Sequence, residues 1–124
     1  MGAATRRVLL IDDDPDDRLL YREMIKEDSQ TDFQVESAEY LADGERLLDE
    51  EHFDLVLLDL SLPESHGIET FEILHDDRVG PPIVVLTGHY DEELGIRAVR
   101  EGAQDYLIKG QVNAHLLVRA IRYA

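Results

Sequence analysis

Short, almost continuously apolar segments are the strongest structural signal in this sequence, and four of them span residues 8–11, 54–58, 82–86 and 106–108. They lack the alternation of polar and apolar residues that marks a strand with one face in water. Strands of a parallel sheet have this continuous pattern because they are covered on both faces. A fifth segment, residues 33–37, does alternate, which predicts an edge strand with one wetter face.

The stretches between these segments are long enough for helical crossovers. The clearest helix begins with Asp14 as a good N-cap and Pro15 at the first helical position. Further helices are expected at residues 39–50, 66–75, 91–101 and 112–124. Five strand–helix repeats predict an open, doubly wound α/β sheet with helices on both faces.

The length of 124 residues suits one compact domain. We place this domain at residues 5–124, after a short N-terminal extension at residues 1–4. The last predicted helix contains neither Gly nor Pro near its end. We therefore expect the helix to continue and the chain to be excised from a longer protein.

The charge and composition exclude several classes of function. Lys and Arg number 12 against 28 Asp and Glu, a net charge of −16 that disfavours direct binding to nucleic acid or anionic lipid. No apolar run approaches the ~18 residues of a membrane span. Cysteine is absent, which removes disulfides and thiolate metal sites and fits a reducing compartment. We expect a cytoplasmic protein.

Polar residues follow the predicted strands directly. Asp12 and Asp13 come after the first strand, Asp59 after the third, Thr87 after the fourth and Lys109 after the fifth. The carboxyl ends of parallel strands meet at one edge, where open α/β sheets bind ligands. The sequence therefore predicts three carboxylates, a hydroxyl and an ammonium group at a single site.

Three neighbouring carboxylates need a cation, since two like charges ~4 Å apart cost about 4 kcal/mol at an effective dielectric near 20. Oxygen ligands without His or Cys favour Mg²⁺, with Mn²⁺ as a second choice. A carboxylate beside such a cation, an ammonium group and a hydroxyl can carry out phosphoryl transfer. Asp59 is the best candidate nucleophile because it stands alone, whereas Asp12 and Asp13 are adjacent and better suited to holding the metal.

These motifs resemble the receiver domain of two-component response regulators, which has the CheY-like (flavodoxin-like) fold. The resemblance covers almost the whole chain and implies a five-stranded parallel sheet in the order 2-1-3-4-5. It rests on the acidic pair after the first strand, the apolar run ending in Asp59, and three later motifs: Leu62-Pro63 with Gly67, Thr87-Gly88, and Tyr106-Leu107-Ile108-Lys109.

The resemblance implies that a sensor histidine kinase or phosphotransfer protein phosphorylates Asp59. Asp13, Asp59 and the backbone carbonyl of Ser61 would ligate Mg²⁺, and Asp12 would act mainly through a metal-bound water. Such a protein is not an enzyme for external substrates, because the phosphotransfer and the autodephosphorylation are self-directed.

The resemblance also implies a switch. Thr87 would hydrogen-bond the phosphoryl oxygen and Lys109 would pair with it, while inward rotation of Tyr106 would remodel the face built from the fourth helix, fifth strand and fifth helix. That face is the expected surface for an output domain, an effector protein or dimerisation.

Two positions tune the phosphorylated state in the family, and they are occupied here by Ser61 and His89. The sequence also departs from the family at Gly110, since proline commonly follows the lysine, and this leaves the rigidity of the loop open.

Other polar residues have simpler interpretations. Asp14, Asp16 and Asp17 are expected to be helix-start charges rather than ligands. The histidines lack the spacing of a metal site or phosphate donor and are expected at the surface: His52, His66, His75, His89 and His115.

Two alternative functions stay open at this point. A docking module could signal without phosphorylation, although the intact acidic set argues against it. An aspartyl-phosphate hydrolase similar to the haloacid dehalogenase family would carry an acid two residues after its nucleophile, and here that position is Ser61.

Overall fold

The computed structural model of the protein describes residues 5–27, 32–62, 65, 67–76 and 79–124. Strands and helices alternate along the chain in five repeats, as predicted. The strands are β1 (Thr5–Ile11), β2 (Asp32–Ala38), β3 (Leu55–Asp59), β4 (Ile83–Thr87) and β5 (Asp105–Ile108). The helices are α1 (Pro15–Lys26), α2 (Leu41–Glu50), α3 (Ile68–Asp76), α4 (Glu92–Glu101) and α5 (Ala114–Arg122).

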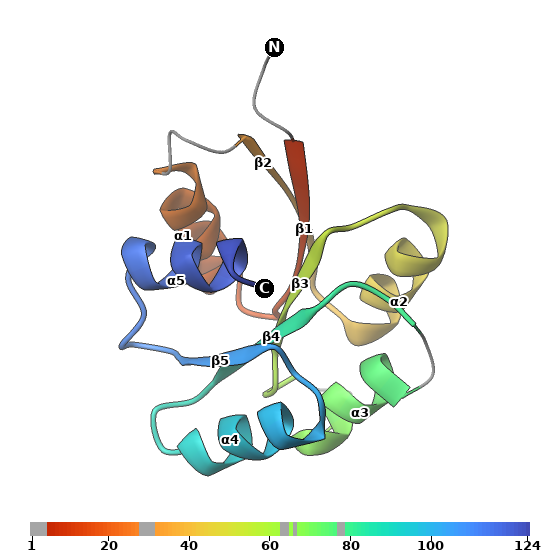
Figure 1. Ribbon diagram of the computed structural model, residues 1–124, viewed down its shortest axis with the longest axis vertical. Coiled ribbons are helices and arrows are strands. Elements are labelled where there is room, and N and C mark those ends of the chain that lie inside the picture. The colour runs from red at the N-terminus through yellow and green to blue at the C-terminus, as the bar shows by residue number, and fades with distance from the viewer. Residues whose placement is uncertain (1–4, 28–31, 63–64, 66, 77–78) are drawn as a thin grey trace.

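The five strands form one parallel sheet in the order β2-β1-β3-β4-β5 (Figure 1), which confirms the expected CheY-like topology. Two of the interior strands, β3 and β4, are buried along their whole length. β2 lies at one edge and alternates between exposed and less exposed residues, as its sequence pattern predicted.

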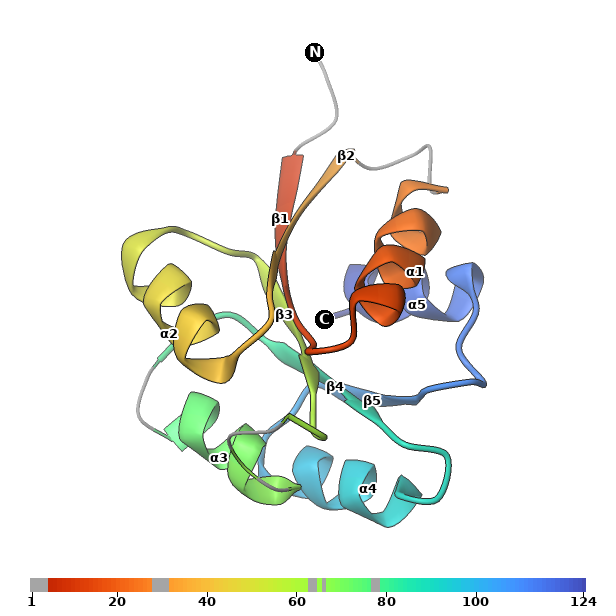
Figure 2. The ribbon, with the colours of Figure 1, turned by 180° about the vertical axis from the view of Figure 1, so that it is seen from behind.

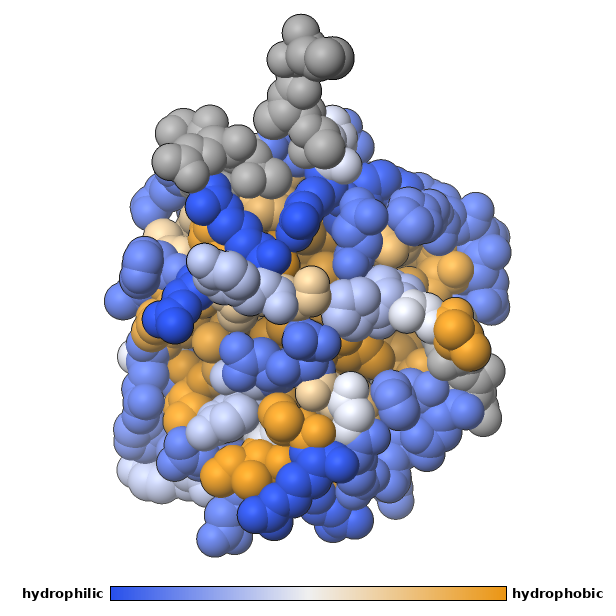
Figure 3. Space-filling view, viewed as in Figure 1, coloured by the Kyte–Doolittle hydropathy of each residue, from blue (hydrophilic) through white to orange (hydrophobic). Residues whose placement is uncertain are grey.

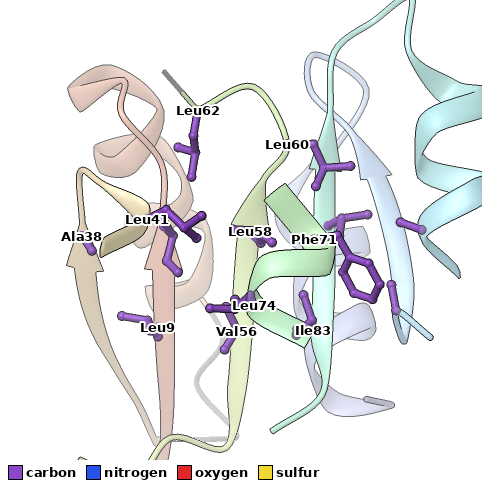
Figure 4. Close-up of a cluster of buried hydrophobic side chains, with 14 of the residues drawn as sticks. Leu9, Ala38, Leu41, Val56, Leu58, Leu60, Leu62, Phe71, Leu74 and Ile83 are labelled. Atoms are coloured by element: carbon purple, nitrogen blue, oxygen red, sulfur yellow. The ribbon is translucent and has the colours of Figure 1, made fainter. Parts of the chain in front are cut away.

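Helices cover both faces of the sheet, with α1 and α5 on one side and α2, α3 and α4 on the other (Figures 1 and 2). Alternate residues of each strand point to opposite faces, so Leu9 and Val56 pack toward α2 and α3 (Figure 4), while Val8 and Leu57 pack toward α1 and α5. This two-sided burial explains why the strands are apolar without alternation.

The ends of several elements differ from the predicted ones. β1 begins at Thr5 rather than at residue 8, because the polar residues before the apolar run continue the pairing with β2, where Thr5 lies opposite Asp32. α5 begins at Ala114 because the side chain of Asn113 caps the backbone N–H of Leu116. Residue 66, the predicted start of the third helix, Pro63 of its motif and the extension at residues 1–4 lie outside the described residues.

Hydrophilic side chains cover most of the face shown in Figure 3, in keeping with the charge of −16. Among the described residues, no helix is both long and apolar enough to cross a membrane.

Candidate functional site

The carboxyl edge of the sheet gathers the polar residues that the sequence predicted there. Asp12 and Asp13 directly follow β1, and Lys109 directly follows β5. Asp59 and Thr87 are the last residues of β3 and β4 rather than the first residues after them. The difference of one position leaves both side chains at the same edge, because the strands are parallel and paired in register.

Carboxylate oxygens of Asp12, Asp13 and Asp59 lie within 4.8 Å of one another. Asp12 and Asp59 are buried, and Asp13 is half-buried. Ligands on opposite sides of an Mg²⁺ ion are about 4 Å apart, so this spacing is close to that of oxygens bound to one cation. The donor set contains only hard oxygen ligands, and therefore it fits Mg²⁺ or Mn²⁺ better than zinc.

Burial raises the pKa of Asp12 to about 6, although the backbone N–H of Asp14 and the ammonium of Lys109 act in the opposite direction. The negative charge of Asp59 adds to the increase. Asp12 therefore lies in a place where its charged form is costly without a further cation nearby.

The ammonium group of Lys109 forms the centre of the acidic cluster. Its Nζ donates hydrogen bonds to Oδ2 of Asp12 at 2.9 Å, of Asp17 at 2.8 Å and of Asp59 at 3.0 Å. Burial alone would lower the pKa of Lys109, but Asp17, Asp59 and Asp12 together raise it above its ordinary value. Lys109 is therefore charged at neutral pH.

Asp59 has both of its carboxylate oxygens held in place. Oδ1 accepts a hydrogen bond from the backbone N–H of Ser61 at 3.0 Å, and Oδ2 accepts one from Lys109. The side chain is only 2% exposed. A fixed carboxylate beside an ammonium group and two further acids is suited to act as a nucleophile toward an anionic phosphorus centre.

Thr87 supplies an unsatisfied hydroxyl. The residue is fully buried, and its Oγ1 has no hydrogen-bond partner among the described residues. A buried hydroxyl without a partner is costly, which makes it ready to bind a ligand oxygen at the edge of the sheet.

The three expected switch and tuning residues have different surroundings. Tyr106 is half-buried on β5, and its hydroxyl donates a hydrogen bond to Glu92 on α4. Ser61 is exposed and contacts the site through its backbone. His89 is exposed, and its ring lies edge-on against Tyr90. The tuning roles of Ser61 and His89, and the carbonyl of Ser61 as a ligand, stay predictions.

Asp17 is an acidic residue in the first turn of α1, as predicted, but its contact with Lys109 was not predicted from the sequence. Asp14 does cap α1 through its side chain, as predicted. Asp17 lies three residues after this cap, and helical side chains lean toward the N-terminus of their helix. Since α1 starts at the carboxyl edge of the sheet, that lean carries Asp17 toward the site, and this signal was present in the sequence.

Known proteins resemble this chain in sequence. The family model of the response regulator receiver domain matches residues 8–122. The cell cycle response regulator CtrA of Brucella ovis is 34% identical over 113 residues, which are 91% of this chain and 47% of that protein. The phosphoglycerate transport system transcriptional regulatory protein PgtA of Salmonella typhimurium is 31% identical over 111 residues, 90% of this chain and 26% of that protein. The chain thus spans less than half the length of these relatives.

Solved structures agree with the fold. A response regulator receiver domain protein from Clostridium thermocellum superposes with a TM-score of 0.81 at 28% identity, covering 94% of this chain and 91% of the other. A CheY-like receiver domain protein from Methanospirillum hungatei gives a TM-score of 0.80 at 28% identity, covering 96% and 92%.

Proposed function

The chain belongs to the response regulator receiver domain family, and on this basis we propose that it accepts a phosphoryl group on Asp59 from a histidine kinase or a phosphotransfer protein. The observation that carries the proposal is the position of Asp59. Its carboxylate is buried at the carboxyl edge of the sheet, is fixed by Ser61 and Lys109, and lies beside the carboxylates of Asp12 and Asp13.

The transfer exchanges one bond for another. A carboxylate oxygen of Asp59 attacks phosphorus and forms a P–O bond, while the P–N bond to the donor histidine breaks. The electron pair of that bond goes to the imidazole nitrogen, and the ring, protonated at its other nitrogen, leaves as neutral imidazole. The product is a mixed anhydride of the Asp59 carboxyl group and phosphate.

Asp13, Asp59 and the Ser61 carbonyl would hold Mg²⁺ or Mn²⁺, with Asp12 acting mainly through a water molecule. When bound, the cation supplies neutralisation of the charge on the phosphoryl oxygens. The ammonium group of Lys109 adds a positive charge to that of the cation. The hydroxyl of Thr87, which has no partner among the described residues, would donate a hydrogen bond to one more phosphoryl oxygen.

Phosphorylation would then change the surface formed by α4, β5 and α5 through Thr87 and Tyr106. We expect this surface to bind an output domain, an effector protein or a second copy of the chain. The relatives PgtA and CtrA are regulators of more than twice the matched length, which supports a separate output segment. The charge of −16 disfavours direct contact between this domain and nucleic acid. The lack of cysteine fits a cytoplasmic setting.

The test is phosphorylation by a small donor. Incubation with phosphoramidate and Mg²⁺ should add one phosphoryl group to the intact protein, as measured by mass spectrometry, and Asp59→Asn should abolish the addition. Asp54→Asn is the matched control, since Asp54 lies at the opposite end of β3 and bonds the backbone of Arg7. Equal labelling of Asp59→Asn would exclude Asp59 as the acceptor. Release of free phosphate in many turnovers would favour a hydrolase instead.

A further inference from the structure

The three partners of Lys109 differ in what else they do. Asp12 and Asp59 belong to the group of acids that would hold the cation, and Asp59 would also receive the phosphoryl group. Asp17 stands outside this group, on the first turn of α1, and its side chain is 30% exposed. Among the described residues that bind Lys109, Asp17 is therefore the one that stays available when the cation and the phosphoryl group engage the other two.

The backbone next to Lys109 gives the lysine little support. Gly110 follows it in the left-handed region, with φ at +88°, and a Cβ built on Gly110 would meet no atom within 4 Å. The loop is therefore open on this side, and the main-chain bond from Lys109 N–H to the Thr87 carbonyl fixes the start of the loop rather than the ammonium group. Nζ itself is bound by three carboxylates, those of Asp12, Asp17 and Asp59.

We propose that Asp17 is a positioning residue, which anchors the Lys109 ammonium from α1 so that Lys109 can bind the phosphoryl group on Asp59. The inference rests on the phosphoacceptor function proposed above. Nζ has three N–H donors, and all three are used by Asp12, Asp17 and Asp59. Once Asp59 is phosphorylated, its carboxyl oxygens lose their negative charge, and the N–H that pointed to Asp59 turns to a phosphoryl oxygen nearby while the bond to Asp17 persists.

A second hydrogen bond joins the start of α1 to the site. Arg18, the next residue of α1, donates a hydrogen bond from Nη1 to the backbone carbonyl of Asp12 at 2.8 Å. The first turn of α1 is thus fixed against the β1 end, which makes it a firm support for Asp17. Asp16, one position earlier in the same turn, is exposed and provides a matched control of equal charge.

The experiment measures the maximal phosphorylation rate at saturating phosphoramidate and Mg²⁺. Asp17→Ala should lower it roughly fivefold, in line with the loss of one partly exposed charge-assisted hydrogen bond. Asp17→Asn keeps an acceptor oxygen and should restore part of the rate, and Asp16→Ala should match the unaltered protein. In a Lys109→Ala background, Asp17→Ala should have no further effect. If Lys109→Ala reacts too slowly, the same four proteins (unaltered, the two single variants and the double variant) are compared by their affinity for beryllofluoride, a phosphoryl mimic.

The outcomes separate this inference from the proposed function. A rate in Asp17→Ala equal to or above that of Asp16→Ala, with the unaltered protein labelled and Asp59→Asn unlabelled, overturns the role of Asp17 alone. An equal loss with and without Lys109 shows a merely structural effect and overturns it too. Failure to label the unaltered protein overturns the phosphoacceptor function, and the role of Asp17 with it.

Discussion

The hydroxyl of Tyr106 donates a hydrogen bond to Oε2 of Glu92 over 2.9 Å, which ties the aromatic side chain of β5 to the first turn of α4. This bond raises the pKa of the Tyr106 phenol, because ionisation would place two negative charges side by side. The surface that we propose as the output face therefore has its aromatic residue fastened to one helix of that face.

Replacement of Glu92 should release the ring of Tyr106. In Glu92→Ala the hydroxyl loses its carboxylate acceptor, so we expect unphosphorylated protein to populate other orientations of Tyr106 more than the unaltered protein does. Fluorine NMR of protein labelled with fluorotyrosine measures this, with the Tyr106 signal assigned by its loss in Tyr106→Phe. Glu93→Ala is the control, as it removes an equal charge from the same turn. An unchanged Tyr106 signal in Glu92→Ala would show that the bond does not hold the ring.

The close approach of Gly95 to Tyr106 gives a second prediction. A Cβ on Gly95 would lie 2.7 Å from Cδ2 and 2.8 Å from Cγ of Tyr106, too close for the ring to stay where it is. We expect Gly95→Ala to lower the free energy of unfolding by about 1 kcal/mol, since overpacking outweighs the better helix propensity of alanine. In a Tyr106→Ala background the two ring contacts are gone and only the Cβ at position 106, 3.0 Å away, stays close, so the same substitution should cost less than in the unaltered protein. Urea unfolding of the four proteins measures both values, and an equal loss of stability in the two backgrounds contradicts the proposed contact between Gly95 and the Tyr106 ring.

Much of the fold follows from local patterns. The continuous apolar runs predicted buried parallel strands, because the sheet is covered on both faces. The end of each run also indicated which polar residue lies at the carboxyl end of that strand. Asp12, Asp59 and Lys109 could thus be brought together from sequence alone, since parallel strands end at one edge.

Contacts between side chains of different elements could not be predicted from the sequence pattern alone. The lean of Asp17 toward the carboxyl edge could be inferred from the sequence, but its bond to Lys109, 92 positions away, depends on how α1 is set against the end of β5. The bond from Tyr106 to Glu92 likewise depends on the side to which the ring turns on β5, and no hydropathy pattern encodes that orientation. Strand ends are set by backbone pairing, which is why β1 extends to Thr5 beyond its apolar run.

Removal of the ammonium group should destabilise the protein in a pH-dependent way. Lys109→Met leaves Asp12 and Asp59 buried without their shared cation, so we expect a loss of about 2 to 3 kcal/mol in the free energy of unfolding at pH 8 without metal. Burial raises the pKa of Asp12 to about 6, so near pH 5 this carboxyl group is largely protonated and needs no such partner, and the loss should be smaller there. Denaturant unfolding at the two pH values checks this, with Lys26→Met, on the last turn of α1, as the control for a lysine outside the acidic cluster. An equal loss at both pH values would mean that the lysine stabilises by packing rather than by charge.

The raised pKa of Asp12 predicts when Mg²⁺ stabilises the fold. Its pKa is about 6 in the folded protein, chiefly through burial, against an ordinary value of 3.8. The folded state therefore binds more protons between these values, so the contribution of Asp12 to stability is full below about pH 4 and is lost as the pH rises through about 6. Above that pH the charged carboxylate is the form that a cation can bind, and there Mg²⁺ should restore the lost stability.

Thermal melts with and without Mg²⁺ should accordingly show a larger increase in Tm at pH 8 than at pH 5, because at the lower pH the cation must first displace the proton from Asp12. Asp12→Asn has no carboxyl group to titrate at this position, so its response to Mg²⁺ should be weaker and should lose the step near pH 6. A control melt in Na⁺, at the same ionic strength as the Mg²⁺ sample, separates specific binding of the cation from screening of the acidic surface. A Tm that does not respond to Mg²⁺ at either pH would contradict the assignment of Asp12, Asp13 and Asp59 as a metal site, since bound cation must stabilise the state that binds it.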